Sequence, residues 1–92
     1  MAKLTQTEII ELKDKGYSAS DLREINNAIK KTTYTLLLDK ADRKEINELE
    51  ALKLLGREEW LKGIVRSAFH IETIRTGLNG ERIRIFSKTF AR

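Results

Sequence analysis

The sequence predicts a small α+β domain, mostly helical, in which four helices precede a C-terminal β-hairpin. Two observations predict this class: apolar residues recur at helical spacing along most of the chain, and a period of two replaces that spacing after His70. A chain of 92 residues is long enough for one domain and too short for two ordinary ones. It lacks proline, which suits a chain built largely from helices.

Residues 1–31 are predicted to form a helical hairpin. Thr5 or Thr7 can cap the first helix, which runs to about Lys15, and Gly16 ends it because glycine accepts the left-handed backbone of a helix end. Ser18 and Asp21 then form a capping-box-like start, in which Asp stands where Glu is usual. Apolar residues follow at helical spacing and carry the second helix to about Lys31.

Residues 32–46 are predicted to form a strand and a loop. The stretch 33–38 is β-branched and aromatic and then apolar, which is typical of a short strand. An extension of the second helix, or a short third helix, is the alternative. The polar run 39–44 predicts a turn or loop. If 33–38 is a third strand, we expect it to pair with the C-terminal hairpin.

Residues 47–70 are predicted to form a helix–turn–helix. Asn47 can cap the first helix with Glu50 reaching back, and Gly56 ends it. The second helix carries a broad apolar stripe, which includes Trp60 and is expected to face the core. The opposite side carries three residues one turn apart: Lys62, Arg66 and His70.

Residues 72–87 are predicted to form a basic β-hairpin. Asn79-Gly80 between alternating segments is a strong hairpin signal, because both residues accept positive φ. Alternation places Arg82 and Arg84 on one face of the second strand, and Arg75 joins them if the register is suitable. Guanidinium groups on one exposed ribbon are suited to phosphate oxygens.

The charge distribution points to an acidic partner. Residues 1–56 carry ten Lys/Arg and ten Asp/Glu, whereas residues 57–92 carry eight and four, so the whole excess of +4 lies in the last segment. Such asymmetry favours nucleic acid as the partner. The candidate nucleic-acid-binding residues are Lys62, Arg66, His70, Arg75, Arg82, Arg84 and Lys88.

The residue content argues against several kinds of chemistry. With no cysteine, the chain has no disulfide, no thiolate nucleophile and none of the usual zinc frameworks. His70 is the single histidine, so a monomer has no His–His metal pair. Glu58 and Glu59 are adjacent and project about 100° apart on a helix, so they do not face each other. With no glycine-rich phosphate loop or nucleophile elbow, we expect no enzymatic activity, no metal and no cofactor.

The sequence also bears on location. No run of 18 apolar residues is present, so we expect no membrane-spanning helix and no membrane partner. The first residues lack the apolar stretch of a secretion signal. We therefore expect the protein to be cytoplasmic.

Two stretches carry a resemblance to a known family. Glu50-Ala51-Leu52-Lys53-Leu54-Leu55-Gly56 and Asn79-Gly80-Glu81-Arg82-Ile83-Arg84-Ile85, joined by a helix, resemble the winged-helix core of excisionase-like and MerR-like proteins over about 40 residues. In that family the first helix ends in a Leu-Gly pair, the second reads DNA, and a glycine-turned wing carries arginine to the backbone. The resemblance implies a winged-helix-like fold that binds double-stranded DNA. The chain also resembles small proteins of phages and mobile elements.

A second helix–turn–helix arrangement is conceivable near the N-terminus. Residues 8–12 and 18–25 resemble the first two helices of recombinase-type domains. Those domains need a third, reading helix, which residues 28–34 would have to supply. The alternative is a helical hairpin that packs over the C-terminal half.

These observations predict a non-enzymatic DNA-binding protein, a transcriptional regulator or excisionase-like architectural factor of a phage or mobile element. The main alternative is a phage-encoded inhibitor that docks on a host nucleic-acid enzyme such as a CRISPR effector, its partner then being a host protein or nucleoprotein. A second alternative is a homodimer that pairs edge to edge along residues 82–86, if that strand is unpaired on one side.

Overall fold

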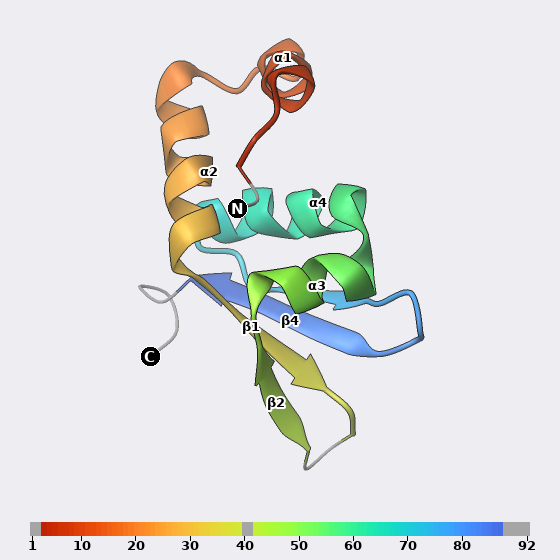
Figure 1. The fold of residues 1–92 in the computed structure, drawn as a ribbon. Helices are drawn as coiled ribbons and strands as arrows, with labels where there is room; N and C mark the ends of the chain where they lie inside the picture. The colour runs from red at the N-terminus through yellow and green to blue at the C-terminus, as the bar shows by residue number, and fades with distance from the viewer. Residues whose placement is uncertain (1–2, 40–41, 88–92) are drawn as a thin grey trace.

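The computed structural model describes residues 3–39 and 42–87 and confirms the predicted α+β class. Within those residues, four helices lie to one side of a four-stranded antiparallel sheet (Figure 1). The elements in chain order are α1 (Gln6–Asp14), α2 (Ala19–Lys31), β1 (Thr32–Leu37), β2 (Arg43–Ile46), α3 (Glu48–Leu55), α4 (Arg57–Ala68), β3 (Thr73–Thr76) and β4 (Arg82–Ser87).

Local hydrogen bonds set the starts of three helices. In each, a polar side chain accepts from the backbone N–H three residues on, and the acid at that position accepts from the cap backbone. These pairs are Thr5 with Glu8, Ser18 with Asp21, and Asn47 with Glu50. The predicted caps are therefore confirmed, and Thr5 is the cap of the first helix.

The sheet has the order β2-β1-β4-β3. The predicted third strand is confirmed as β1, and it pairs along its whole length with β4, as expected for 33–38. The prediction of a loop through Lys44 is wrong, because residues 43–46 form β2. Only Ile46 of β2 is buried, so a charged edge strand keeps its side chains in water while its backbone pairs with β1.

Two alternatives drawn from the sequence do not fit this topology. β4 has a partner on each side, β1 and β3, so residues 82–86 offer no free edge for a second copy. Residues 28–34 form no separate reading helix, since α2 continues to Lys31 and β1 begins at Thr32. The β-branched pair Thr32-Thr33 favours the extended strand over further helix at that point.

The core lies between the helices and one face of the sheet. Trp60 and Ile64 of α4 are fully buried against Ile83 and Ile85 of β4. Helix and strand approach closely at Gly63, where a Cβ would lie 2.4 Å from Cδ1 of Ile85. The prediction that Trp60 belongs to the core is confirmed by this packing.

Candidate nucleic-acid interface

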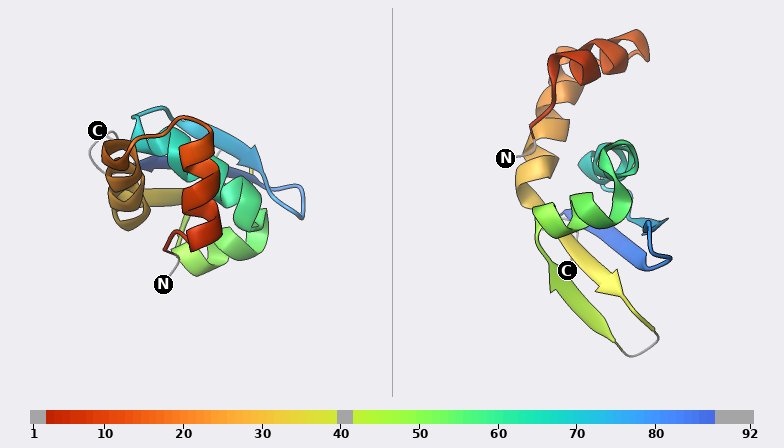
Figure 2. Two further views of the ribbon diagram at one scale, coloured as in Figure 1. Left: turned by 90° about the horizontal axis from the view of Figure 1, so that it is seen from above. Right: turned by 45° about the vertical axis from the view of Figure 1, so that its right-hand side comes forward.

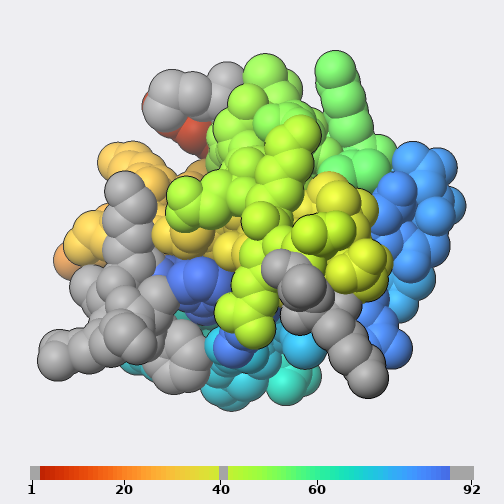
Figure 3. Space-filling view, turned by 90° about the horizontal axis from the view of Figure 1, so that it is seen from below, coloured from red at the N-terminus to blue at the C-terminus, as the bar shows by residue number. Residues whose placement is uncertain are grey.

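The sheet has one face that the helices do not cover, which we call the open face. Strand alternation and the register place alternate residues of the four strands on this face, opposite the buried Ile83 and Ile85. Seen from below, residues of β1, β2 and β4 reach the surface there (Figure 3). The open face consists of Thr33, Thr35, Leu37, Arg43, Glu45, Ile74, Thr76, Arg82, Arg84 and Phe86.

The register orders these side chains in rows that cross the sheet. One row runs Arg43, Leu37, Arg82 and Thr76. The next row runs Glu45, Thr35, Arg84 and Ile74. Phe86 follows beside Thr33. The open face thus brings three arginines and an aromatic ring together from two strands, β2 and β4.

Arg84 is held in a fixed orientation on the open face. Its Nη2 donates to Oε2 of Glu72 at 2.7 Å, and both side chains are 31% exposed. Its guanidinium carbon lies 5.8 Å from the centroid of the Phe86 ring, within cation–π range. Because Glu72 compensates the charge and Phe86 supports the plane, Arg84 presents a flat, positioned surface.

Arg43 and Arg82 differ from Arg84 because both are exposed and carry uncompensated charge. In the part of the chain that the structure describes, neither has an ion-pair partner. Both pair with Leu37, which lies between them on β1. Two strand spacings separate their backbones, about 10 Å. The row therefore offers two guanidinium groups to an anionic ligand.

Arg75 lies on the covered face, so it does not join the arginines of the open face. It pairs with Ile83, and its Nη1 donates to Oε1 of Glu59 at 3.2 Å. The cause is the turn: the N–H of Gly80 donates to the carbonyl of Gly77, and of the Asn79-Gly80 pair only Gly80 has positive φ. This is the pattern of a three-residue loop with a glycine bulge, one residue longer than a two-residue turn, which moves Arg75 to the other face.

The predicted residues of α4 lie elsewhere on the molecule. Lys62 is within 3.5 Å of Glu58 and 3.4 Å of Glu59, so its charge is compensated. Arg66 is exposed on the same helix, and His70 follows its end at a φ of 61°. Lys88 lies outside the described residues. Lys62, Arg66 and His70 therefore do not join the open face.

The N-terminal segment passes over α4, as seen from above (Figure 2, left). Arg57 at the start of α4 donates to Glu8 at 2.7 Å, and this hydrogen bond lowers the pKa of Glu8. At the other end Phe69 stacks on Tyr17, with ring centroids 6.2 Å apart. Between these two contacts lies a groove of about 730 Å³, which is lined mainly by residues of α1 and α4. The major groove of DNA is about 12 Å wide and admits a single helix. Because the N-terminal segment covers α4, insertion of α4 into the groove is disfavoured.

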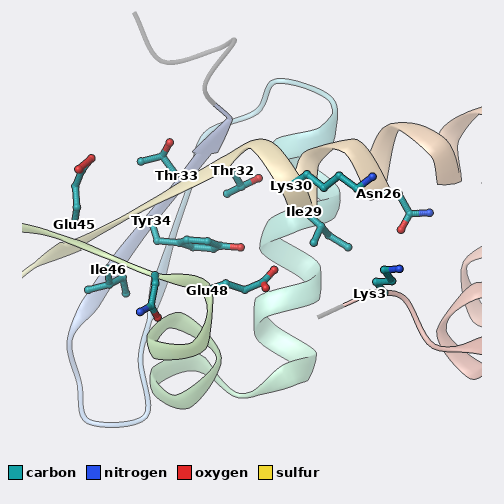
Figure 4. A pocket seen from close by; sticks show the side chains of 11 residues that line it. Lys3, Asn26, Ile29, Lys30, Thr32, Thr33, Tyr34, Glu45, Ile46 and Glu48 are labelled. Carbon is teal, nitrogen blue, oxygen red and sulfur yellow. The ribbon is translucent and has the colours of Figure 1, made fainter. Parts of the chain in front are cut away.

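A second cavity, of about 830 Å³, lies between α2, β1, β2 and the start of α3 (Figure 4). Its lining mixes lysines, Lys3 and Lys30, with the carboxylate of Glu48. The Tyr34 hydroxyl accepts from Nε1 of Trp60 at 3.1 Å, and burial raises the pKa of Tyr34 to about 12. Tyr34 therefore keeps its proton at neutral pH and serves packing. Among residues 3–39 and 42–87, no cluster of three His, Cys, Asp or Glu could hold a metal.

The chain was compared with known protein families, curated proteins and solved structures. No family model, no curated protein and no solved structure matches the chain. No helix within the described residues is long and apolar enough to cross a membrane.

Sequence reasoning missed two residues of the open face, Phe86 and Arg43, and also Glu72, which orients Arg84. Phe86 continues the period of two set by Arg82 and Arg84, so alternation could have found it. Arg43 could not be assigned to this face, because it lies on β2, and the charged residues of β2 do not predict a strand. Glu72 precedes β3, and its contact with Arg84 depends on the hairpin register.

Proposed function

We propose that this chain is a non-enzymatic nucleic-acid-binding protein whose binding surface is the open face. The observation that carries the proposal is the row in which Arg43 and Arg82, two arginines without ion-pair partners in the described chain, flank Leu37 beside Arg84 and Phe86. Exposed guanidinium groups match phosphate oxygens in geometry and charge.

The order of elements supports nucleic acid over other anionic partners. α3 and α4 are joined through Gly56 and are followed by the β3–β4 ribbon. β1, which precedes them, pairs with β4. This order of elements is similar to the helix–turn–helix and ribbon of winged-helix proteins, and we propose the role of a regulator or architectural factor of a phage or mobile element on that resemblance. The proposal departs from that outline in placing the contacts on the sheet instead of on α4.

The test compares two double variants with the same loss of charge. Arg43→Ala with Arg82→Ala removes the unpaired cations of the open face, and Lys13→Ala with Arg23→Ala removes two exposed cations from α1 and α2. Fluorescence anisotropy with labelled single-stranded and duplex DNA, over a range of salt concentrations, gives affinity and salt dependence. We expect the open-face variant to bind at least about tenfold more weakly at low salt.

The salt dependence identifies the cause of the loss. Each lost phosphate contact lowers the log–log slope by about 0.7 on a single strand and about 0.9 on a duplex, so two lost contacts lower it by about 1.4 or about 1.8. The control variant should change the slope far less. Equal effects of the two variants would contradict the assignment to the open face. If neither nucleic acid binds the unaltered protein at low salt, the proposed function is wrong, and the protein-docking inhibitor becomes the proposal to test.

A further inference from the structure

We infer that the open face binds single-stranded nucleic acid, with an unpaired base stacked on the Arg84–Phe86 pair and phosphates at Arg43 and Arg82. This inference rests on the proposed function and names its substrate class. It follows from three features of the face: its width, its stacking platform, and the division of charge among its arginines.

The width of the sheet disfavours a duplex. Arg84 and Phe86 lie on β4, an interior strand with β1 on one side and β3 on the other. A sheet of four strands is about 14 Å across between its outer strands, before side chains are added. The major groove, about 12 Å wide, accepts a helix or a two-stranded ribbon. The centre of the open face therefore reaches no base edge of an intact duplex, whereas a single strand can lay its bases on it.

The Arg84–Phe86 pair provides a surface on which a base can stack. Unpaired bases stack on aromatic rings and on guanidinium planes. Here the guanidinium lies over the Phe86 ring, and its hydrogen bond to Glu72 fixes its orientation before a ligand arrives. A base can add to this stack on the guanidinium plane or on the partly exposed ring. Such stacking accepts any base, so we expect little sequence preference.

The arginines of the open face divide into one suited to stacking, Arg84, and two suited to phosphate binding, Arg43 and Arg82. Glu72 compensates Arg84, which leaves Arg43 and Arg82 as the uncompensated cations of the described open face. Glu45, next to Thr35 in the Arg84 row, adds a negative charge at the β2 edge. Phosphates are therefore expected to follow the Arg43–Leu37–Arg82 row, which contains no acid, in preference to the row that contains Glu45. Thr33, which pairs with Phe86, has a short, partly exposed side chain, whereas Thr35, which pairs with Arg84, is buried.

The experiment uses a substitution that keeps an apolar side chain but removes the ring. Phe86→Leu is compared with Phe69→Leu, the same change at an exposed ring near the end of α4, outside the open face. Each variant is titrated into oligothymidine of about 15 nucleotides and into a duplex of the same length. Arg84→Lys, which keeps the charge and loses the plane, is a second variant in case Phe86→Leu disturbs folding, as judged by circular dichroism.

We expect the unaltered protein to bind the single strand more tightly than the duplex. Loss of one base stack weakens single-strand binding by between about 5-fold and about 150-fold, and Phe86→Leu and Arg84→Lys should fall in that range. Phe69→Leu should match the unaltered protein. Equal affinity for both nucleic acids, or full single-strand affinity in both open-face variants, would overturn the inference while the proposed function stands. Binding of neither nucleic acid would overturn both.

Discussion

The two faces of the sheet are made from the same strands and have opposite characters. On β4, Ile83 and Ile85 are 0% exposed beneath the helices, whereas the alternating Arg82 and Arg84 lie on the open face. A shift of one residue exchanges the two environments. The comparison teaches that alternation gives each strand two roles: one face packs against the helices in the core, and the other presents arginines and an aromatic ring.

The largest expected effect lies on the covered face. Ile85→Ala removes a fully buried side chain that packs against α4, and we expect it to lower the free energy of unfolding by about 2–5 kcal/mol. Urea denaturation measures the change. Nucleic-acid affinity per folded molecule should stay the same. A loss below about 1 kcal/mol would contradict the close packing of helix on strand.

A smaller effect is expected at the buried hydrogen bond of the same face. Tyr34→Phe leaves Nε1–H of Trp60 without its acceptor, which should cost about 1–3 kcal/mol of stability at neutral pH. Tyr17→Phe, at the other tyrosine, is the matched control and should change stability by less than about 0.5 kcal/mol.

The stability difference between the unaltered protein and Tyr34→Phe should depend on pH in the alkaline range. Burial raises the pKa of Tyr34 to about 12 from an ordinary value of 10.0, so the folded state favours the neutral hydroxyl. The associated stability is fully present below pH 10.0 and is lost as the pH rises toward 12. The stability difference between the unaltered protein and Tyr34→Phe should therefore narrow over that range. A difference that stays constant would argue against burial of this hydroxyl.

The smallest effect is expected at an apolar residue of the open face. Ile74 is 54% exposed, so Ile74→Thr, which keeps a β-branched side chain, should change the free energy of unfolding by less than about 0.5 kcal/mol. Urea denaturation again gives the measurement. A cost well above about 1 kcal/mol would mean that the open face is itself packed, and the contrast between the faces would not hold.

Signals that act over a few residues could be interpreted from the sequence. The caps at Thr5, Ser18 and Asn47 depend on contacts three residues apart; the last two formed as predicted, and the first formed at one of the two candidate threonines. Alternation in β4 was equally local, so the separation of Arg82 and Arg84 from the buried isoleucines was predictable. In each case the deciding interaction lies within one element.

The pairing of β1 with the C-terminal hairpin was predicted, but other features that depend on pairing between distant segments were not. The strand β2 exists because β1 offers it hydrogen bonds, although its own residues are nearly all charged. The side of the sheet on which Arg75 lies was set by a single extra residue in the turn before Gly80. The covering of α4 by the N-terminal segment likewise rests on Arg57 and Glu8, which are far apart in the sequence.

The position of Trp60 gives the protein a built-in optical reporter. It is the single tryptophan of the chain, it is fully buried beneath the covered face, and its indole N–H is bound to Tyr34. We therefore expect its fluorescence to follow unfolding, which brings the indole into water, and to respond little to a ligand on the opposite side of the sheet. A single sample can then report folding through this intrinsic emission while a labelled oligonucleotide reports binding, so a variant that fails to fold is distinguished directly from one that folds and fails to bind.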